Sequence, residues 1–295
     1  MKIVALVQAR LGSTRLPNKV IKEINKIPMI ELLLARLSQS QYINQIVVAT
    51  SINPQDDKLQ DLVESLNYEC FRGDEQDVLG RFYFAAQENI ADTVVRITGD
   101  CPLIDSELID ECIHTFKSEN VDYVSNTIPE TFPDGLDVEV MSFDSLKRAY
   151  NESKSKFDRE HVTSYIRNSD KFTKKSITNP EDLSGIRWTV DELNDFIVID
   201  RVFSYFHPNI LFNWRDVMEL QRKQPKTFIE NQDIIRNEGS KLNEGQKLYK
   251  RAKKIIPGGN MLLSKRPEMF LPNNWPAYFR KSEGCKVTDL DGHEY

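Results

Sequence analysis

The sequence has few cysteines, and none of them lies in a metal-binding or disulfide pattern. The four are far apart and form no C-x-x-C pair: Cys70, Cys101, Cys112 and Cys285. This spacing excludes a disulfide framework and a cysteine-based zinc site, and it indicates reduced thiols in a cytoplasmic protein. Long apolar runs are missing too. No stretch approaches the roughly 20 residues that span a membrane, and the apolar run at the N-terminus is too short for a signal peptide.

An excess of positive charge is also missing. The chain carries 39 Lys and Arg against 45 Asp and Glu, a formal net charge of −6. Because nucleic-acid-binding proteins need a basic surface, we expect no nucleic-acid partner, although a local basic pocket for an anion remains possible. The G-x-x-x-x-G-K-[ST] pattern of a P-loop is absent. The histidines His114, His207 and His293 have no metal-ligand spacing, so we interpret them as structural.

What is present is the alternating pattern of an α/β protein. The 295 residues, 40% of them hydrophobic, suffice for one large domain with an appendage. Short β-branched runs predict strands at 3–7, 45–50, 68–71 and 93–97. Apolar residues at helical spacing predict helices after Pro28, after Asn53-Pro54 and over 77–88. Strands that alternate with helices predict βαβ units and a Rossmann-like, three-layer fold with a mostly parallel sheet.

The middle and the end of the chain change character. Further strands are predicted at 122–125, 136–140 and 186–190, and helices at 142–150, 159–167, 195–206 and 213–223. Near Gly239 the composition shifts, and a basic amphipathic helix over 241–256 ends at Pro257-Gly258-Gly259, before short strands. We therefore predict two domains, residues 1–236 and a linker with a smaller piece at 237–295.

The loop after the first strand carries a possible anion site. Arg10, Arg15 and Lys19 surround Gly12 directly after the apolar run 3–7. Ligands of open α/β sheets bind outside the carboxyl ends of the strands. Arginine forks and a lysine charge suit phosphate oxygens, and a glycine lets backbone N–H groups approach a ligand. The loop therefore favours a nucleoside triphosphate site, and an ordinary solvated surface loop is the alternative.

Two aspartates at predicted strand ends suit a hard metal ion. Asp100 follows the strand 93–97 and Gly99, and Asp191 ends the strand 186–190. Mg²⁺ prefers carboxylate oxygens and shares its coordination shell with phosphates and water. The alternative is helix capping. For Asp105 we prefer capping. We expect Asn194 or Asp195 to cap the helix that follows Asp191.

Two further groups could bind an acceptor. Asp137 and Glu139 would share one face of the strand 136–140 and could bind a polyhydroxylated molecule. The alternative is an edge strand whose polar face is simply exposed to solvent. Arg159 could hold a carboxylate or phosphate, and ordinary charge pairs at a surface helix are the alternative.

Three of these segments together resemble a known family. Residues 9–19 resemble the A-R-x-x-S-x-R-L-P-x-K signature of the sugar-acid cytidylyltransferases, which make CMP-Kdo and CMP-sialic acids, with Asn18 in place of the usual glycine. Residues 96–102 look like the family's strand-G-D-x-P metal motif, and 188–195 like its V-D-x-x-x-D motif. P-D-G-L-D-V-E at 133–139 and R-E-H-V-T at 159–163 are closest to the branch named after spore-coat polysaccharide protein F.

The resemblance, which covers residues 1–236, implies transfer of CMP from CTP to a sugar acid with release of pyrophosphate. It implies catalytic roles for Arg15, Lys19 and Asp100, and a Mg²⁺ ion on Asp100 and Asp191. The implied nucleotide-binding residues are Ala9, Arg10, Gly12, Ser13, Arg15, Lys19, Thr98 and Asp100. The implied acceptor-binding residues are Asp137, Glu139, Arg159, His161 and Arg187.

The resemblance also implies an antiparallel subregion of the sheet for dimerisation and acceptor binding, and a homodimer with its contact around 122–170. It leaves other functions open. A sugar-1-phosphate or polyol-phosphate nucleotidyltransferase would share the architecture, and a basic pocket near Arg159 and Arg187 would favour it. A non-catalytic nucleotide-binding module is the alternative from another class.

Residues 243–295 resemble a different family. L-Y-K-R-A-K-K-I-I-P-G-G at 248–259 and the segment 284–295 are similar to the N-terminus of class III aminotransferases of the glutamate-1-semialdehyde aminomutase kind. Those enzymes hold pyridoxal phosphate on a lysine far downstream. We therefore expect a truncated bifunctional protein whose present residues have no transaminase activity.

Overall fold

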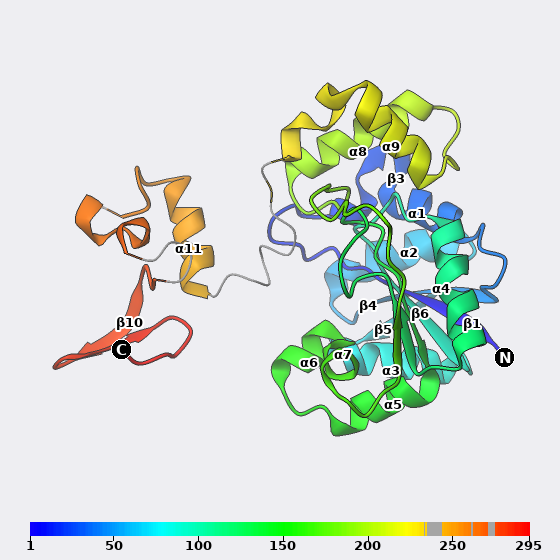
Figure 1. The fold of residues 1–295 in the computed structure, drawn as a ribbon, viewed down its shortest axis with the longest axis horizontal. Coiled ribbons are helices and arrows are strands. Elements are labelled where there is room, and N and C mark those ends of the chain that lie inside the picture. Colours follow the sequence, from blue (N-terminus) through cyan, green and yellow to red (C-terminus); the bar gives the residue numbers. More distant parts are fainter. Residues whose placement is uncertain (233, 235–243, 261, 271–274) are drawn as a thin grey trace. The chain divides into compact units, whose positions relative to one another are not determined.

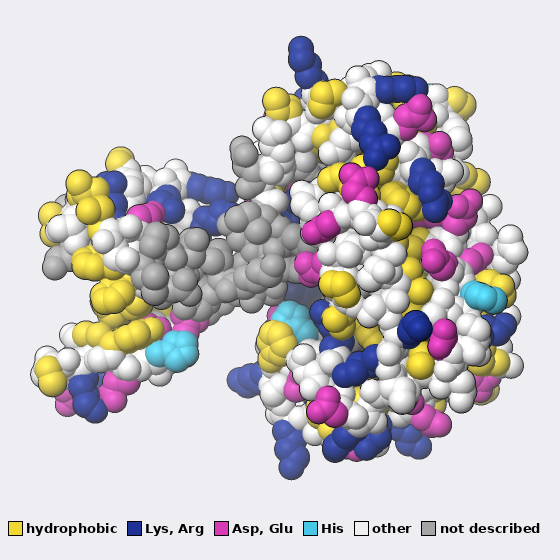
Figure 2. Space-filling model, in the orientation of Figure 1, with side chains coloured by type: hydrophobic (Ala, Val, Ile, Leu, Met, Phe, Trp, Pro, Cys, Tyr) yellow, Lys and Arg dark blue, Asp and Glu magenta, His cyan; other side chains and the backbone are white. Residues whose placement is uncertain are grey.

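The computed structural model divides into two compact units, Met1–Asp233 and Ile234–Tyr295 (Figure 1). It describes residues 1–232, 234, 244–260, 262–270 and 275–295. Within these ranges, every helix is too short or too polar to cross a bilayer. On the face drawn in Figure 2, basic and acidic side chains are interspersed over the larger unit.

A seven-stranded sheet with the order β5-β4-β1-β6-β8-β7-β9 forms the centre of the larger unit. Its strands are β1 (Ile3–Gln8), β4 (Gln45–Ser51), β5 (Glu69–Gly73), β6 (Thr93–Thr98), β7 (Tyr123–Ser125), β8 (Glu139–Ser142) and β9 (Lys174–Ser176). All neighbours from β5 to β6 are parallel, whereas β8 is antiparallel to both β6 and β7. The mostly parallel sheet with an antiparallel subregion is thus confirmed.

Helices cover both faces of this sheet. They are α1 (Met29–Leu37), α2 (Asp57–Ser65), α3 (Val78–Glu88), α4 (Ser106–Glu119), α5 (Phe143–Glu152), α6 (Lys156–His161), α7 (Ser164–Asn168), α8 (Leu193–Phe206) and α9 (Trp214–Lys223). Short elements complete the unit: the 3-10 helices η1 (Lys19–Ile21), η2 (Pro54–Asp56) and η3 (Pro225–Asn231), and the strand pair β2 (Glu23–Ile24) and β3 (Ile27–Pro28).

Side chains of β1 alternate between two apolar cores. Ala5 and Val7 pack into a cluster with α1, α2, α4, α8 and α9. Val4 and Leu6 pack into a second cluster with α3, α5 and α7. Successive side chains of a strand point to opposite faces, so a strand that is buried on both faces must be apolar throughout. This explains why the opening run has no polar residue before Gln8, and it confirms the three-layer fold.

The predicted helix 159–167 is wrong because the chain turns sharply at its middle. Val162 has φ 56° and ψ −64°, and the N–H of Thr163 donates to the carbonyl of His161 at 2.6 Å. This is a γ-turn of the rare, strained kind, here centred on a buried β-branched residue. It ends α6 at His161 and lets α7 begin in a new direction at Ser164.

Two predicted strands also differ. Regular pairing of β8 begins only at Glu139, so Asp137 precedes the strand. Residues 186–190 form no strand of the sheet and make one isolated bridge, between Arg187 and Asp134. There the N–H of Trp188 donates to the carbonyl of Asp134 at 2.6 Å, and the N–H of Asp134 to the carbonyl of Ile186 at 2.8 Å. This segment therefore pairs with the 133–136 turn instead of a sheet edge.

The smaller unit contains α11 (Glu244–Lys253), the 3-10 helices η4 (Leu263–Lys265) and η5 (Pro267–Met269), and a hairpin of β10 (Phe279–Glu283) and β11 (Lys286–Asp289). The helix predicted over 241–256 ends earlier, at Lys253, and its first residues 241–243 lie outside the described ranges. Gly284, with φ 61°, lies in the turn of the hairpin.

Gly135 is expected to be essential for the pairing of the 133–136 turn with residues 186–190. It has φ 111°, and a Cβ atom there would lie 2.7 Å from the backbone N of Thr189. Gly135→Ala should lower the free energy of unfolding by at least about 2 kcal/mol, measured by urea denaturation. Gly185→Ala is the control, because nothing lies within 4 Å of a Cβ at that position. Equal stabilities of the two variants would contradict this interpretation.

Candidate active site

Arg15, Lys19, Asp100 and Asp191 lie together at one edge of the sheet. The Lys19 ammonium donates to Asp100 Oδ2 at 2.9 Å, to Asp191 Oδ1 at 2.9 Å and to the carbonyl of Val190 at 2.8 Å. Arg15 Nη2 lies 2.9 Å from Asp191 Oδ1. The predicted phosphate-binding and metal-binding residues thus form one cluster, although they come from three distant parts of the chain.

Asp100 is placed by the junction of β1 and β6. The Gly99 N–H donates to the carbonyl of Gln8 at 2.8 Å, and a Cβ at Gly99 would lie 2.9 Å from that of Ala9. Close backbone approach therefore requires glycine before Asp100. The carbonyl of Asp100 accepts from the Val190 N–H at 2.8 Å, which ties the two aspartate-bearing segments together.

Asp191 is placed by Arg187, which was predicted to bind an acceptor. The structure differs: Arg187 is buried, and its guanidinium contacts three carboxylates, those of Asp134 at 2.9 Å, Asp191 at 3.1 Å and Asp195 at 2.9 Å. An arginine whose donors are already used by the protein is not available to a ligand. Arg187 is therefore a positioning residue that holds Asp191 from the side opposite Lys19.

Two predicted caps are confirmed in this region. Asp195 Oδ2 accepts from the N–H groups of Asp191 and Glu192 at 2.9 and 3.0 Å, in a capping box whose N-cap is Glu192. Asp105 caps α4 by accepting from the N–H groups of Glu107 and Leu108 at 3.0 and 3.2 Å.

The charges in the cluster stabilise one another. Burial alone would lower the pKa of Lys19, but Asp100 and Asp191 more than offset it and raise this pKa above its ordinary value. Burial would raise the pKa of Asp100, yet the Lys19 ammonium lowers it to about 2. Arg187 likewise lowers the pKa of the buried Asp195. The shifts of Lys19, Asp100 and Asp195 therefore favour the charged form of each of these three groups.

The oxygen atoms around Lys19 fit a hard cation. Two carboxylates and one backbone carbonyl converge on a single positive atom at 2.8 to 2.9 Å. Oxygen donors of this kind suit Mg²⁺, which takes one or two carboxylates and completes its shell with phosphates and water. In the described ranges no group of three or more His, Cys, Asp or Glu side chains could hold a metal by itself.

The loop between β1 and η1 holds the remaining predicted nucleotide-binding residues. Ala9 is buried, and Arg10 Nη1 contacts Glu75 Oε1 at 2.9 Å. The N–H of Leu11 donates to the buried Asp56 at 2.7 Å. A Cβ at Gly12 would lie 2.6 Å from Gln55 Nε2, so a larger residue would displace that side chain.

Asn18, Ser13 and Thr98 complete the description of this edge. Asn18 has φ 57° and ψ 23°, a left-handed conformation that asparagine tolerates better than most residues. This explains how it replaces the usual glycine. The N–H of Ser13 donates to the carbonyl of Leu11 at 2.8 Å, and Thr98 Oγ1 lies 3.1 Å from Cys101 Sγ.

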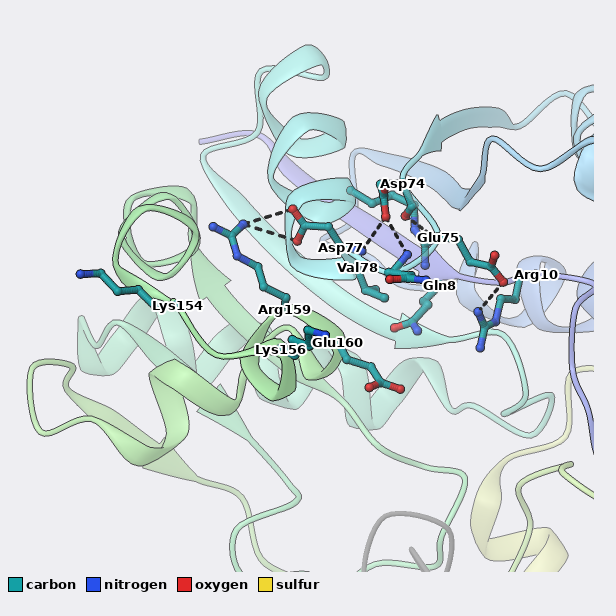
Figure 3. Close-up of a pocket in the computed structure, with 12 residues that line it drawn as sticks. Gln8, Arg10, Asp74, Glu75, Asp77, Val78, Lys154, Lys156, Arg159 and Glu160 are labelled. Atoms are coloured by element: carbon teal, nitrogen blue, oxygen red, sulfur yellow. Dashed lines mark hydrogen bonds and ion pairs between the residues drawn. The ribbon is translucent and has the colours of Figure 1, made fainter. Parts of the chain in front are cut away.

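A cavity of about 660 Å³ lies beside this loop (Figure 3). Arg10 and Glu75 form an ion pair on one side of it, and Arg159 of α6 reaches Asp77, the N-cap of α3, at 3.2 Å. Lys154 points away from the other labelled side chains. Sequence reasoning missed residues 74–78, although they follow the carboxyl end of β5 and the same strand-end rule applies to them.

Glu139 does not lie on a solvated edge, and its carboxylate is occupied by donors of the protein itself, so the structure does not favour it as an acceptor-binding residue. It is buried and accepts hydrogen bonds from Arg96, from the hydroxyl of Tyr123 and, at 2.6 Å, from Thr163 Oγ1. Burial would raise the pKa of Glu139, but Arg96 lowers it. Glu139 thus joins β6, β7 and the γ-turn beside His161.

Of the other predicted acceptor residues, Asp137 is half-buried just before β8. His161 is the last residue of α6, and its ring centroid lies 4.3 Å from that of Phe157. Arg159 lines the cavity, where its guanidinium also donates to the carbonyl of Tyr150 at 3.0 Å.

A family model described as Cytidylyltransferase matches residues 4–234. The chain is 38% identical over 253 residues to "Uncharacterized protein MJ1063" of Methanocaldococcus jannaschii, a match that covers 85% of this chain and 98% of that protein. It is 29% identical over 214 residues to the spore coat polysaccharide biosynthesis protein SpsF of Bacillus subtilis, covering 68% and 86%. The branch expected from the motifs at 133–139 and 159–163 is therefore among its relatives.

Shorter matches and a solved structure agree with this. Matches of 115 to 127 residues, 30% to 33% identical, are to bacterial enzymes named 3-deoxy-manno-octulosonate cytidylyltransferase, such as that of Trichlorobacter lovleyi, and cover 44% to 50% of those enzymes. A cytidylyltransferase structure from Leptospira borgpetersenii has a TM-score of 0.75 at 32% identity, and the match covers 79% of this chain and 99% of that one. The aminotransferase resemblance of residues 243–295 lies beyond the matched family model and stays a prediction.

Removing the charge of Glu139 should destabilise the fold. Glu139→Gln leaves the Arg96 guanidinium without its counter-charge, which should lower the free energy of unfolding by about 3 kcal/mol at pH 7. A carboxyl with a lowered folded pKa stabilises the fold above its unfolded pKa, about 4.3 for Glu, and this contribution is lost as the pH falls through the folded value.

The stability difference between the wild type and Glu139→Gln should therefore be full at pH 7 and shrink below about pH 4. Urea denaturation at several pH values measures it. Glu64→Gln, on the surface of α2, is the control, and a difference as small as that of the control would show that Glu139 is not part of a buried ion pair.

Proposed function

The chain belongs to the cytidylyltransferase family, and on that premise we propose that it transfers CMP from CTP to a sugar acid, dependent on Mg²⁺. It is a nucleotidyltransferase, so the question is which acceptor and which metal it uses. The observation that carries the proposal is the contact of Lys19 with Asp100 and Asp191 at 2.9 Å. This contact supports the proposal because it brings the lysine proposed to bind phosphate together with the two carboxylates proposed to bind Mg²⁺.

The proposed reaction is a displacement at phosphorus. A hydroxyl oxygen of the acceptor, the anomeric one of a sugar acid, bonds to the α-phosphorus of CTP, the bond from this phosphorus to the bridging oxygen breaks, and pyrophosphate leaves. Arg10, Arg15 and Lys19 would hold the triphosphate in line for this attack. Catalysis then depends on positioning and on neutralising charge more than on covalent help from the protein.

Asp100 and Asp191 would hold the Mg²⁺ ion. When bound, this ion supplies neutralisation of phosphate charge and acidifies a coordinated hydroxyl. The site fits it because two carboxylate oxygens and a carbonyl oxygen already surround one cationic atom. The proton of the attacking hydroxyl would pass to solvent water, so we assign no general base, and one such as His161 would be dispensable.

The acceptor would enter the cavity beside Arg10. A sugar acid is supported by the signature at 9–19 and by the relatives named for 3-deoxy-manno-octulosonate. Asp137, Arg159 and His161 remain the proposed acceptor residues, whereas Glu139 and Arg187 serve as positioning residues. Five Lys and Arg residues line the cavity against four Asp and Glu: Arg10, Arg81, Lys154, Lys156 and Arg159 against Asp74, Glu75, Asp77 and Glu160. This positive balance also supports the second candidate, a sugar phosphate as acceptor.

Other parts of the proposal concern the biological setting. The name of the Bacillus relative supports a role in surface polysaccharide biosynthesis. We keep the homodimer with a contact around 122–170 as a proposal. We also keep the resemblance of residues 243–295 to class III aminotransferases as a proposal.

A pyrophosphate-release assay tests the function. Each of the four nucleoside triphosphates is combined with a panel of sugar acids and sugar phosphates, with and without Mg²⁺. We expect release with CTP, a sugar acid and Mg²⁺ together. Release only with sugar phosphates would favour the second candidate, and no release with any combination would contradict the proposal.

Asp100→Asn should abolish turnover while the fold persists. Loss of a metal ligand should lower kcat by more than about a hundredfold, because even residues behind metal ligands contribute 10- to 100-fold. The circular dichroism spectrum should stay close to that of the wild type, which would show that the fold persists. Asp61→Asn, on the exposed face of α2, is the matched control. If Asp100→Asn keeps near-normal turnover with Mg²⁺, the metal assignment is wrong.

A further inference from the structure

The residues proposed to hold the triphosphate contact the residues proposed to hold the metal. Lys19 contacts one oxygen of Asp100 and one of Asp191. Arg15 Nη2 lies 2.9 Å from the same oxygen of Asp191. Each partner therefore has to leave the other before it can bind its own ligand.

All three N–H donors of the Lys19 ammonium have an acceptor in the protein. The residue is 8% exposed, and an ammonium has three N–H donors. Its three acceptors are Asp100 Oδ2, Asp191 Oδ1 and the carbonyl of Val190, at 2.8 to 2.9 Å. These are the oxygens that a hard cation would use. Lys19 thus lies at the point where such an ion would have to bind.

The charges around this point nearly cancel. Three cationic side chains contact four carboxylates: Arg15, Lys19 and Arg187 against Asp100, Asp134, Asp191 and Asp195. A bare divalent ion that approaches this cluster meets little net negative charge and has to displace an ion pair with buried members. This arrangement of charges therefore disfavours a metal ion that arrives alone.

Of the residues in this contact, Lys19 is the one whose side chain can move away most easily. Asp100 is fixed by the β1–β6 junction, and Asp191 is held by Arg187 at 3.1 Å. Lys19 ends in a single charge on a flexible four-carbon stem. It begins η1, at the end of the loop from β1. A shift of its side chain would expose both carboxylates without moving the sheet.

We propose that Lys19 is an internal substitute for the divalent cation, and that it leaves this position when the triphosphate arrives. This inference rests on the proposed function. The phosphates supply new partners for Lys19 and Arg15, which releases Asp100 and Asp191 to the metal ion. Metal and nucleotide then bind as a coupled pair, and by linkage each raises the affinity for the other by the same factor.

Manganese binding to the nucleotide-free protein tests this proposal. Free Mn²⁺ is measured by electron paramagnetic resonance during titration of the full chain. Lys19→Met keeps the length of the side chain and removes its charge. We expect it to bind Mn²⁺ at least about tenfold more tightly than the wild type, within the usual range of coupling factors. Lys22→Met is the matched control. This lysine, three residues further on, lies over the ring of Phe196 and should leave the affinity unchanged.

Two further variants keep the test decisive. Arg15→Met removes one contact of Asp191 from a residue whose side chain is 46% exposed, so it should fold even if Lys19→Met does not. It should strengthen Mn²⁺ binding by a smaller factor. In Lys19→Met/Asp100→Asn the gain should disappear, because the ion then lacks a ligand. A gain that persists in this double variant means that Mn²⁺ binds elsewhere, and it would overturn the proposal.

Unchanged or weaker Mn²⁺ binding in Lys19→Met, or, if this variant does not fold, in Arg15→Met, would also overturn it. This readout involves no turnover, so it is independent of the pyrophosphate assay. A protein that transfers CMP but shows no gain in Lys19→Met loses only the present inference. If Lys19→Met shows the gain but the protein releases no pyrophosphate, the inference on the cation position stands and the proposed function is contradicted.

Discussion

The buried guanidinium of Arg187 is the interaction on which the site depends. It joins the 133–136 turn through Asp134, the proposed metal ligand Asp191, and the first turn of α8 through Asp195. Asn231, at the end of η3, adds a hydrogen bond to Asp195 at 3.0 Å. Four segments that share no regular sheet pairing are thereby held in one arrangement. A buried ion network of this kind costs desolvation, and its value lies in fixing where Asp191 points.

Much of the larger unit could be predicted from local patterns. A strand buried on both faces has to be apolar throughout, so the run from Ile3 to Val7 identified β1 and with it the sheet. The same strand-end rule placed Lys19 and Asp100 near each other, and parallel pairing of β1 with β6 does bring them together. The cap at Asp105 was equally predictable, because its function is local to one helix.

Charged residues whose partners lie far away in sequence were predicted less well. Glu139 alternates with apolar neighbours, which is the pattern of a wet strand face. Its actual environment is set by Arg96 and Thr163, which are 43 and 24 residues away. The resemblance assigned Arg187 to an acceptor, and the local sequence does not reveal that three carboxylates surround it. Nor does helical periodicity reveal that Val162 adopts a positive φ.

The left-handed backbone at Asn18, with φ 57°, changes how the signature at 9–19 should be read. The position before the lysine requires a left-handed backbone conformation. It does not require one particular amino acid. Asparagine meets it at a modest energetic cost, and aspartate should do so as well, whereas β-branched residues should not. A search pattern that insists on glycine there would reject this chain. A pattern that accepts every residue able to adopt these torsion angles would retain it. Such a pattern would also retain any sequence that has another permitted residue at this position.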